Sequence, residues 1–321
     1  MSVHASLRGF GLAALMCLAP GAVCAEEWPG SSPIRWYVGV APGGGADIVT
    51  RSVAERLSKK LKTPVIVENK PGADQAIAAQ FVSRAKPDGH TLLTVAGPNV
   101  HARPIPDVGQ GLAPVALLSR GPVILAGASS NAPKDLRSLI AAVKAAPERW
   151  NYATAGYGSL HHIAGELFNS VAGTRMNMIP YHGGGQSIAA AVSAQVQLVV
   201  IGVGPTIPYM KADQLIGYAV AAKDRFPAIP NVPTFAELGF PDVDISQVFG
   251  VAAPEGTPAQ VIDALNAAFN EVVQDPEIKD LILREGATVQ PMSAAEFGKE
   301  YQAELAKADY LAKKLNVTAP Q

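Results

Sequence analysis

Three short glycine-rich segments carry the residue types in this sequence that could do chemistry. In the first, "VGVAPGGGADIVTR" (38–51), three consecutive glycines separate an apolar run from a helical pattern. The other two are "TAGYGSLHH" (154–162) and "YHGGGQS" (181–187), and each again lies between a predicted strand and a predicted helix. Backbone N–H groups at a helix N-terminus favour an anion. One glycine turn is explained by chain reversal alone, but three at strand ends indicate a ligand-binding cleft.

The first glycine segment does not match the known phosphate-binding loops. A P-loop requires Lys followed by Ser or Thr after its last glycine, whereas Gly45 is followed by Ala46 and Asp47. The dinucleotide-binding pattern G-x-G-x-x-G fits Gly43 and Gly45 but fails at Ile48. A carboxylate at Asp47 would also repel a polyphosphate. These departures argue against nucleotide binding.

The second segment contains a serine and two histidines, which are possible nucleophile and metal-ligand residues. The hydrolase pattern G-x-S-x-G fails because Tyr157 and His161 occupy its glycine positions, although Ser159 and His162 could still form a hydrolytic pair. The simpler interpretation makes Ser159 the N-cap of the next helix. His162 and Glu166 share a helix face, but no H-E-x-x-H motif or thiolate cluster accompanies them. A secreted serine hydrolase is the weaker alternative, and we predict neither a metal nor a cofactor.

The segments around these residues alternate between strand and helix patterns. Strands are predicted at 34–40, 64–68, 91–95, 150–155, 176–181, 196–203 and 215–221. Helices are predicted at 46–61, 75–84, 133–146, 163–172, 186–193, 258–274 and 294–315. Ser293 and Glu296 would form a capping box for the last helix. The alternation predicts an α/β protein with a mostly parallel sheet flanked by helices.

The composition and the N-terminus indicate an exported soluble protein. The 321 residues carry a formal net charge of −1 and no long basic run, which argues against nucleic acid and membrane surfaces as partners. Arg8, a short apolar run (10–19) and small residues before position 26 predict a cleavable signal peptide over residues 1–25. Its cut is expected near Ala25. Both cysteines lie inside this segment, so the mature chain has no disulfides, and the expected location is a bacterial periplasm.

The motifs, taken together, resemble one family along nearly the whole mature chain. The stretch "VGVAPGGGADIVTRSVAERLSKKLKTPVIVENKPGA" resembles the opening of the Bug/TctC-type receptors, which are solute-binding proteins of tripartite tricarboxylate transporters. "KPDGHTLL", "NYATAGYGSLHHIAGELF", "IPYHGGGQSIAAAVSAQVQL", "AKDRFPAIPNVPTFAELGFPD" and "APEGTPAQVIDALN" are similar to later motifs of that family, in the same order.

The resemblance implies a type II periplasmic binding protein of Venus-flytrap form. Two α/β domains joined by crossing strands would close as a hinge on a small carboxylate. The expected first domain comprises residues 26–125 and 248–321, and the second comprises residues 126–247. The implied function is non-enzymatic delivery of the ligand to integral membrane transporter subunits. A ligand sensor for a membrane signalling protein is the alternative, and we expect a monomer because nothing in the sequence indicates oligomerisation.

The resemblance also assigns ligand-binding positions to the three glycine segments. The expected set is Ala41, Pro42, Gly43, Gly44, Gly45, Asp47, Pro98, Asn99, Thr154, Gly158, Ser159, His162, Tyr181, His182, Gly183 and Gly184. Within this set, Asp47 is expected to cap its helix and brace the loop, and the Ser159 hydroxyl is expected to donate to the ligand. Two departures from the family pattern concern ligand identity: Asp74 and Gln75 replace small residues, and the segment 101–112 is short. Asp74 could pair with an amino group or be an exposed loop side chain.

Overall fold

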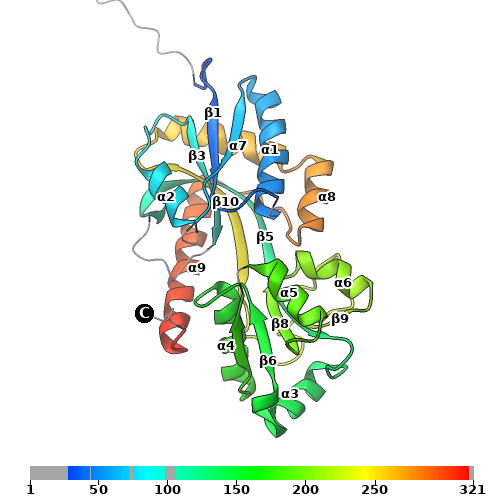
Figure 1. Cartoon of the computed structure of the whole chain (residues 1–321). Coiled ribbons are helices and arrows are strands. Elements are labelled where there is room, and N and C mark those ends of the chain that lie inside the picture. Colours follow the sequence, from blue (N-terminus) through cyan, green and yellow to red (C-terminus); the bar gives the residue numbers. More distant parts are fainter. Residues whose placement is uncertain (1–27, 44, 73–74, 98–105, 182, 318–321) are drawn as a thin grey trace, which may run out of the picture.

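The computed structural model describes residues 28–43, 45–72, 75–97, 106–181 and 183–317. These residues form two α/β lobes joined by two strands that run from one lobe into the other (Figure 1). The predicted signal peptide lies outside the described residues. None of the described helices combines the length and the apolar character needed to cross a membrane.

The first lobe contains a mixed sheet with the strand order β2-β1-β3-β10-β5, and β4 pairs with the start of β5. Its strands are β1 (Ile34–Val38), β2 (Val65–Asn69), β3 (Thr91–Gly97), β4 (Asp107–Val108), β5 (Gly111–Ala128) and β10 (Ser246–Pro254). Three helices pack on one face of the sheet: α1 (Gly45–Leu61), α7 (Ala259–Val272) and α8 (Pro276–Arg284). Two helices pack on the other face: α2 (Ala76–Ser83) and the first half of α9 (Ala294–Lys314).

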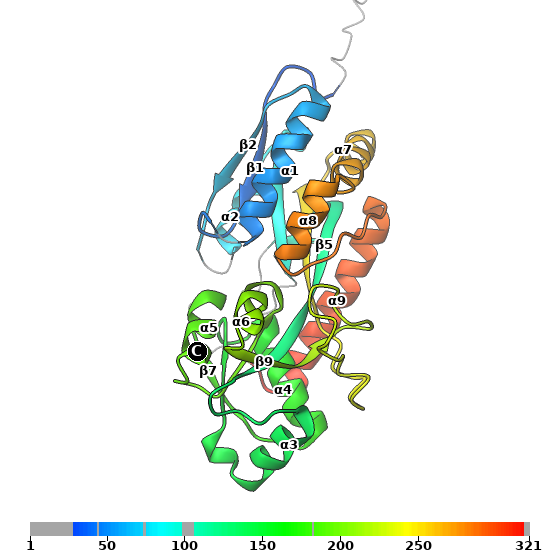
Figure 2. The ribbon, with the colours of Figure 1, turned by 90° about the vertical axis from the view of Figure 1, so that its right-hand side faces the viewer.

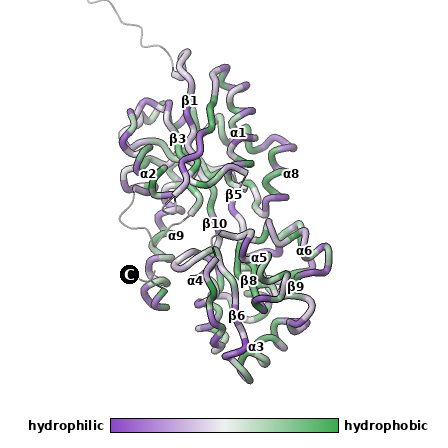
Figure 3. Tube along the Cα trace, in the orientation of Figure 1, coloured by the Kyte–Doolittle hydropathy of each residue, from purple (hydrophilic) through white to green (hydrophobic). Residues whose placement is uncertain are grey.

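Side-chain alternation along β1 explains why helices cover both faces of this sheet. Ile34 and Trp36 point into the core that contains α1 and α7, whereas Tyr37 points into the core that contains α2. The Trp36 ring meets the ring of Phe269 of α7 edge-on, with centroids 5.1 Å apart. A strand that is apolar on both sides requires cover on both sides. Hydrophobic residues accordingly lie inside each lobe, between its helices (Figure 3).

The second lobe repeats this arrangement with the strand order β9-β5-β8-β6-β7. Its further strands are β6 (Asn151–Thr154), β7 (Asn177–Pro180), β8 (Leu198–Gly202) and β9 (Leu215–Ala221). The helices α3 (Leu136–Ala145) and α4 (Leu160–Ala172) pack on one face. The helices α5 (Gly184–Val192) and α6 (Ile207–Lys211) pack on the other.

The long strand β5 belongs to both sheets and changes lobe near its middle. Residues 112–122 of β5 pair antiparallel with β10, whereas residues 123–128 pair with β8 and β9. The change falls at Gly121 and Pro122, where a Cβ built on Gly121 would lie 2.5 Å from the Gly286 carbonyl oxygen. The crossing strands implied by the family resemblance are therefore present as β5 and β10.

The helix α9 runs alongside the crossing strands and packs on both lobes (Figure 2). Phe297, Tyr301 and Leu305 belong to a core cluster of the first lobe, whereas Ala308 and Leu311 belong to a core cluster of the second. The predicted capping box at its N-terminus is confirmed: the Ser293 side chain accepts from the Glu296 amide, and the Glu296 side chain accepts from the Ser293 amide. The helix provides a third connection between the lobes.

The sequence pattern predicts most elements within three residues of their observed bounds. It does not predict the strands β5 and β10, the helix α8, or the short elements β4 and α6. The helices α4 and α5 begin three and two residues before the predicted starts at 163 and 186. The reason is that the predicted starts were placed after the polar and glycine residues, which in fact form the first helical turns.

Candidate ligand-binding site

The strand register places the carboxyl ends of the parallel strands of both lobes at the crossing. Gly97, at the end of β3, pairs with Val248 near the point where β10 enters the first lobe. Gly202, at the end of β8, pairs with Val123, directly after the change of lobe in β5. Because β1 and β2 are parallel to β3, and β6 and β7 are parallel to β8, all these strands end at facing edges. Open α/β sheets bind ligands at such edges.

Each predicted glycine segment opens a helix on one of these facing edges. The first precedes α1 in the first lobe, and the second and third precede α4 and α5 in the second lobe. In both views the N-terminal end of α1 is directed toward the lobe that carries α5 (Figures 1 and 2). The first-turn amides of a helix lack partners within the helix, so three sets of N–H donors and three positive dipole ends lie around the crossing.

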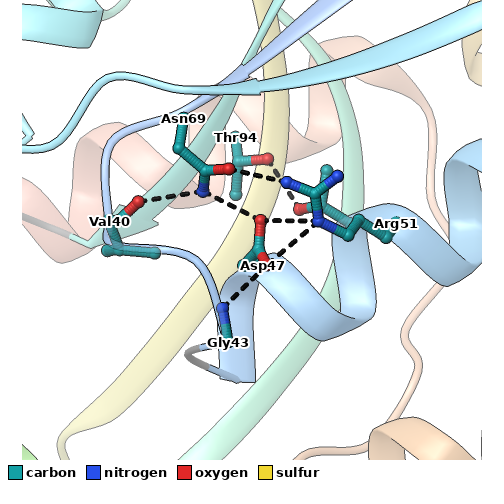
Figure 4. Close-up of polar contacts among 7 residues, drawn as sticks. Val40, Gly43, Asp47, Arg51, Asn69 and Thr94 are labelled. Atoms are coloured by element: carbon teal, nitrogen blue, oxygen red, sulfur yellow. Dashed lines mark hydrogen bonds and ion pairs between the residues drawn. The ribbon is translucent and has the colours of Figure 1, made fainter.

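The first turn is held by a buried carboxylate (Figure 4). The Asp47 side chain is 3% exposed, and its Oδ2 accepts from the Gly43 amide at 2.9 Å. Its Oδ1 accepts from Asn69 Nδ2 at 2.8 Å, and Arg51 Nε lies 3.1 Å from both oxygens. Asn69 Nδ2 also donates to the Val40 carbonyl at 3.0 Å. The predicted bracing role of Asp47 is thus confirmed, although Asp47 lies inside the first turn of α1 rather than at its N-cap.

The protonation of Asp47 follows from these contacts. Burial raises the pKa of this carboxyl, but hydrogen bonds from Arg51, Gly43 and Asn69 outweigh burial, so the pKa lies below its ordinary value. Asp47 is therefore a carboxylate at neutral pH. Its charge is already matched by Arg51 and by donors of the loop, which fits a structural role better than contact with an anion.

The second turn is a compact hydrogen-bonded unit at the start of α4. The Ser159 hydroxyl donates to the Gly156 carbonyl at 2.7 Å and accepts from the His162 amide at 3.2 Å. Ser159 is therefore the N-cap, as the simpler interpretation predicted. The Thr154 hydroxyl, at the end of β6, accepts from the Gly156 amide at 3.2 Å. This geometry ties the predicted ligand-binding Ser159 and Thr154 to the same residue of the turn.

The Ser159 hydroxyl and the His162 ring each form hydrogen bonds with the backbone of the turn. The Gly158 amide donates to Nδ1 of His162 at 3.1 Å, so a neutral imidazole carries its proton on Nε2. A general base would have to accept the serine proton, which here goes to the Gly156 carbonyl. The arrangement in this structure thus differs from the hydrolytic pair considered from the sequence.

The third turn is linked to the second through a buried serine. Gly183 has a φ of 106°, which favours glycine, and α5 begins at the next residue. The Ser187 hydroxyl lies 2.8 Å from the Thr154 carbonyl and 3.0 Å from the Gly183 carbonyl. Because the Ser187 side chain contacts both turns, it fixes the position of the start of α5 relative to the end of β6. A Cβ built on Gly185, the second helical residue, would meet nothing within 4 Å.

Several expected site residues fall outside the part of the chain that the structure describes. These are Gly44, Pro98, Asn99 and His182, together with Asp74. Of the remainder, Ala41, Pro42 and Gly43 are exposed on the first turn, and Tyr181 and Gly184 are partly exposed at the third.

Sequence reasoning missed a fourth glycine turn and an acidic residue. The strand β8 ends at Gly202, and Gly204 opens a short 3-10 turn (Gly204–Thr206) before α6. The signal was present in "VVIGVGPT", an apolar run followed by two glycines. Glu285, after α8, reaches the start of α1: a Cβ built on Gly45 would lie 2.7 Å from Glu285 Oε2. No local pattern indicates this contact, because the two residues are distant in the sequence.

A groove of about 590 Å³ lies elsewhere, between α9 and the loop after β9, and no residue of the three turns lines it. Its lining includes Arg120, which pairs with Glu300 and Glu304 of α9. Among the described residues, no group of three or more His, Cys, Asp or Glu side chains could hold a metal ion.

Comparison with known proteins agrees with this architecture. The family described as "Tripartite tricarboxylate transporter family receptor" matches residues 49–317. A UPF0065 protein of Bordetella bronchiseptica is 36% identical over 274 residues, which cover 82% of this chain and 79% of that protein. The protein BugT of Bordetella pertussis is 31% identical over 277 residues, which cover 83% of this chain and 83% of that protein.

Solved structures show the same fold. The periplasmic binding protein BugD superposes with a TM-score of 0.77 at 27% identity, over 89% of this chain and 98% of that one. MatC from Rhodopseudomonas palustris, solved with bound malate, superposes with a TM-score of 0.76 at 29% identity, over 88% of this chain and 99% of that one. The chain therefore belongs to the tripartite tricarboxylate transporter receptor family, whose members are periplasmic solute-binding proteins.

Proposed function

We propose that this protein captures a small carboxylate between its two lobes in the periplasm and delivers it to a tripartite tricarboxylate-type membrane transporter. The observation that carries the proposal is the placement of three glycine turns, each opening a helix, on the facing edges of the two lobes. Helix N-termini bind anions through N–H groups without a cationic side chain. Malate bound to the similar MatC supports a carboxylate as the ligand class.

The proposed binding surface combines the turns of both lobes. From the first lobe it takes residues 41–45, with Asp47 as the brace, and residues 98–99. From the second it takes Gly158, Ser159 and residues 181–184, and the predicted Thr154 and His162, which are buried, support this turn from behind. The Gly43 and Gly158 amides already donate to Asp47 and His162, so the amides of Gly45 and Gly184 are the stronger candidates for direct contact.

The proposed domains are residues 26–125 with 248–321, and residues 126–247. Ligand binding between them would favour a closed arrangement over an open one, with β5 and β10 bending near Gly121 and Pro122. The helix α9 contacts both domains and would adjust with the hinge.

The test is direct binding to the mature chain after its ligand has been removed by unfolding and refolding. Isothermal titration calorimetry would use mono-, di- and tricarboxylates and amino acids. We expect at least one carboxylate to bind with a 1:1 stoichiometry and to raise the melting temperature, by about 2.7 kcal/mol of stabilisation at one hundred times its Kd. Refolded protein that binds none of these compounds would contradict the proposal.

The transporter partner requires a separate experiment. The mature chain, with bound ligand, would be passed over membranes that contain the cognate tripartite transporter subunits. Retention by those membranes is expected. Retention instead by a membrane signalling protein would support the sensor alternative.

A further inference from the structure

An acidic side chain, Glu285, lies where the two lobes and the first glycine turn meet. Its Oε2 occupies the position next to Gly45, the first residue of α1, where a Cβ would approach it to 2.7 Å. Its main chain contacts the second lobe: a Cβ built on Gly204 would lie 2.1 Å from the Glu285 carbonyl oxygen. Glu285 therefore belongs to the first lobe, touches the second, and places its carboxyl at the start of α1.

Close packing at this contact fixes the position of Glu285. A Cβ built on Gly286 would lie 2.1 Å from the Gly204 nitrogen, so the two glycines allow the backbones of the lobes to meet. Thr288, two residues after Gly286, forms two backbone hydrogen bonds with Arg120 of the crossing strand β5, at 3.0 and 2.9 Å. The chain around Glu285 is thus anchored on both the crossing strand and the second lobe.

The Glu285 carboxyl has no partner within the described part of the chain. It makes no hydrogen bond or ion pair with another described residue, although it is only partly exposed. Burial raises the pKa of Glu285, and the neighbouring Arg284 opposes that shift. The N-terminus of α1 favours a negative charge beside it, but the burial that raises the pKa of Glu285 disfavours the charged form, and a cationic group of a ligand would stabilise that form further.

The position of this carboxyl also restricts the ligand. A carboxylate ligand bound at the N-terminus of α1 would lie close to a second negative charge, which repels it. A ligand that carries an ammonium group beside its carboxylate removes this conflict, because the carboxylate takes the amides and the ammonium takes Glu285. A ligand that carries only carboxylates leaves the repulsion in place.

We propose that Glu285 determines specificity by binding a cationic group of the ligand, so that the protein selects amino-bearing carboxylates over carboxylates without an amine. The inference rests on the proposed function, because it assumes that a carboxylate binds at the turns between the lobes. Glu285 acts on the choice of ligand through its side chain, whereas its main chain forms the contact with the second lobe.

The experiment compares ligands that differ by one amino group. The pairs are aspartate with succinate, glutamate with glutarate, alanine with propionate, and phenylalanine with phenylpropionate. Calorimetry on refolded mature chain is expected to show, in at least one pair, an amino member that binds at least tenfold more tightly. Glu285→Gln keeps the size and the hydrogen-bonding capacity of the side chain but removes its charge. We expect this variant to lose at least tenfold in affinity for the amino member and to show no preference within the pair.

A matched control is Glu148→Gln, an exposed glutamate of the second lobe, and it should leave all affinities unchanged. Thermal unfolding of Glu148→Gln should match the parent protein, and Glu285→Gln should be at least as stable as the parent, which would show that the fold is intact. The inference is overturned if the parent protein binds the amine-free member at least as tightly, or if Glu285→Gln keeps the preference. In both cases carboxylate binding itself persists, so the proposed function would stand. Absence of binding by every member would overturn the inference together with the proposed function.

Discussion

Asp47→Asn should destabilise the first glycine turn. All the polar partners of the Asp47 carboxylate are donors: the Gly43 amide and Arg51 Nε approach Oδ2, and Asn69 Nδ2 and Arg51 Nε approach Oδ1. An asparagine has one oxygen, so its NH2 group must face a donor. Losing one hydrogen bond to a buried charged group costs about 1.5–3 kcal/mol. The ion pair with Arg51, whose side chain is 48% exposed, adds little, roughly 0–1 kcal/mol.

The expected loss in the free energy of unfolding is therefore about 1.5–4 kcal/mol, or roughly 2–6 °C in melting temperature for a chain of this length. Urea unfolding followed by circular dichroism measures the first quantity, and thermal unfolding measures the second. Affinity for the carboxylate that binds best should fall as well, because Asp47 holds Gly43 two residues before the α1 N-terminus. Asp135→Asn is the matched control: Asp135 is an exposed N-cap that accepts the Ser138 amide, and asparagine caps about as well.

The difference in the free energy of unfolding between the parent protein and Asp47→Asn should also depend on pH. The pKa of Asp47 is lower in the folded protein than its ordinary value of 3.8, so the folded state binds fewer protons at this group. Its stabilisation is thus fully present above the ordinary value and is lost as the pH falls through the folded value. The gap between parent and Asp47→Asn should shrink below about pH 4. A difference below about 0.5 kcal/mol at pH 7, or one that does not change on acidification, would refute this account of the turn.

Three further substitutions test the other turns and the contact between the lobes. Gly185→Ala should not destabilise the free protein, since alanine favours a helix over glycine by up to about 1 kcal/mol. It should weaken carboxylate binding at least tenfold in calorimetry. Unchanged affinity would show that the ligand does not approach this residue. Ser159→Ala should lower stability by about 1 kcal/mol through loss of the N-cap and should also weaken binding, and unchanged affinity would remove Ser159 from the site. Gly204→Ala should force the lobes apart, because its Cβ would lie 2.1 Å from the Glu285 carbonyl oxygen. Solution scattering should show that the liganded variant is less compact than the liganded parent protein. An unchanged radius of gyration would contradict the contact between the lobes.

The sequence predicted the parts of the site that depend on local patterns. The glycine turns, the N-cap at Ser159 and the brace at Asp47 all involve residues within four positions of one another, so the chain order itself brings them together. The alternation of strands and helices likewise predicted the parallel sheets and, through them, the shared edge where the turns lie.

The parts that could not be predicted depend on contacts between distant segments. The strand β5 carries no period-two pattern, because most of its residues are buried on both faces, and it changes sheet in its middle. Asn69 meets Asp47 only because β2 lies beside β1 in the sheet. Glu285 reaches Gly45 only because α8 packs against α1. Such contacts are set by tertiary packing, which no single segment encodes.

The most direct test of the central claim is the chemical shift of glycine amides in refolded mature protein labelled with 15N-glycine. A carboxylate that binds by calorimetry would be added to saturation while 1H–15N correlation spectra are recorded. We predict that the amides of Gly45, Gly184 and Gly185 shift strongly, since they lie at the N-termini of α1 and α5, whereas Gly89 and Gly239, on outer turns, do not. A ligand that saturates the protein without shifting the amides at either helix N-terminus would contradict carboxylate binding between the lobes.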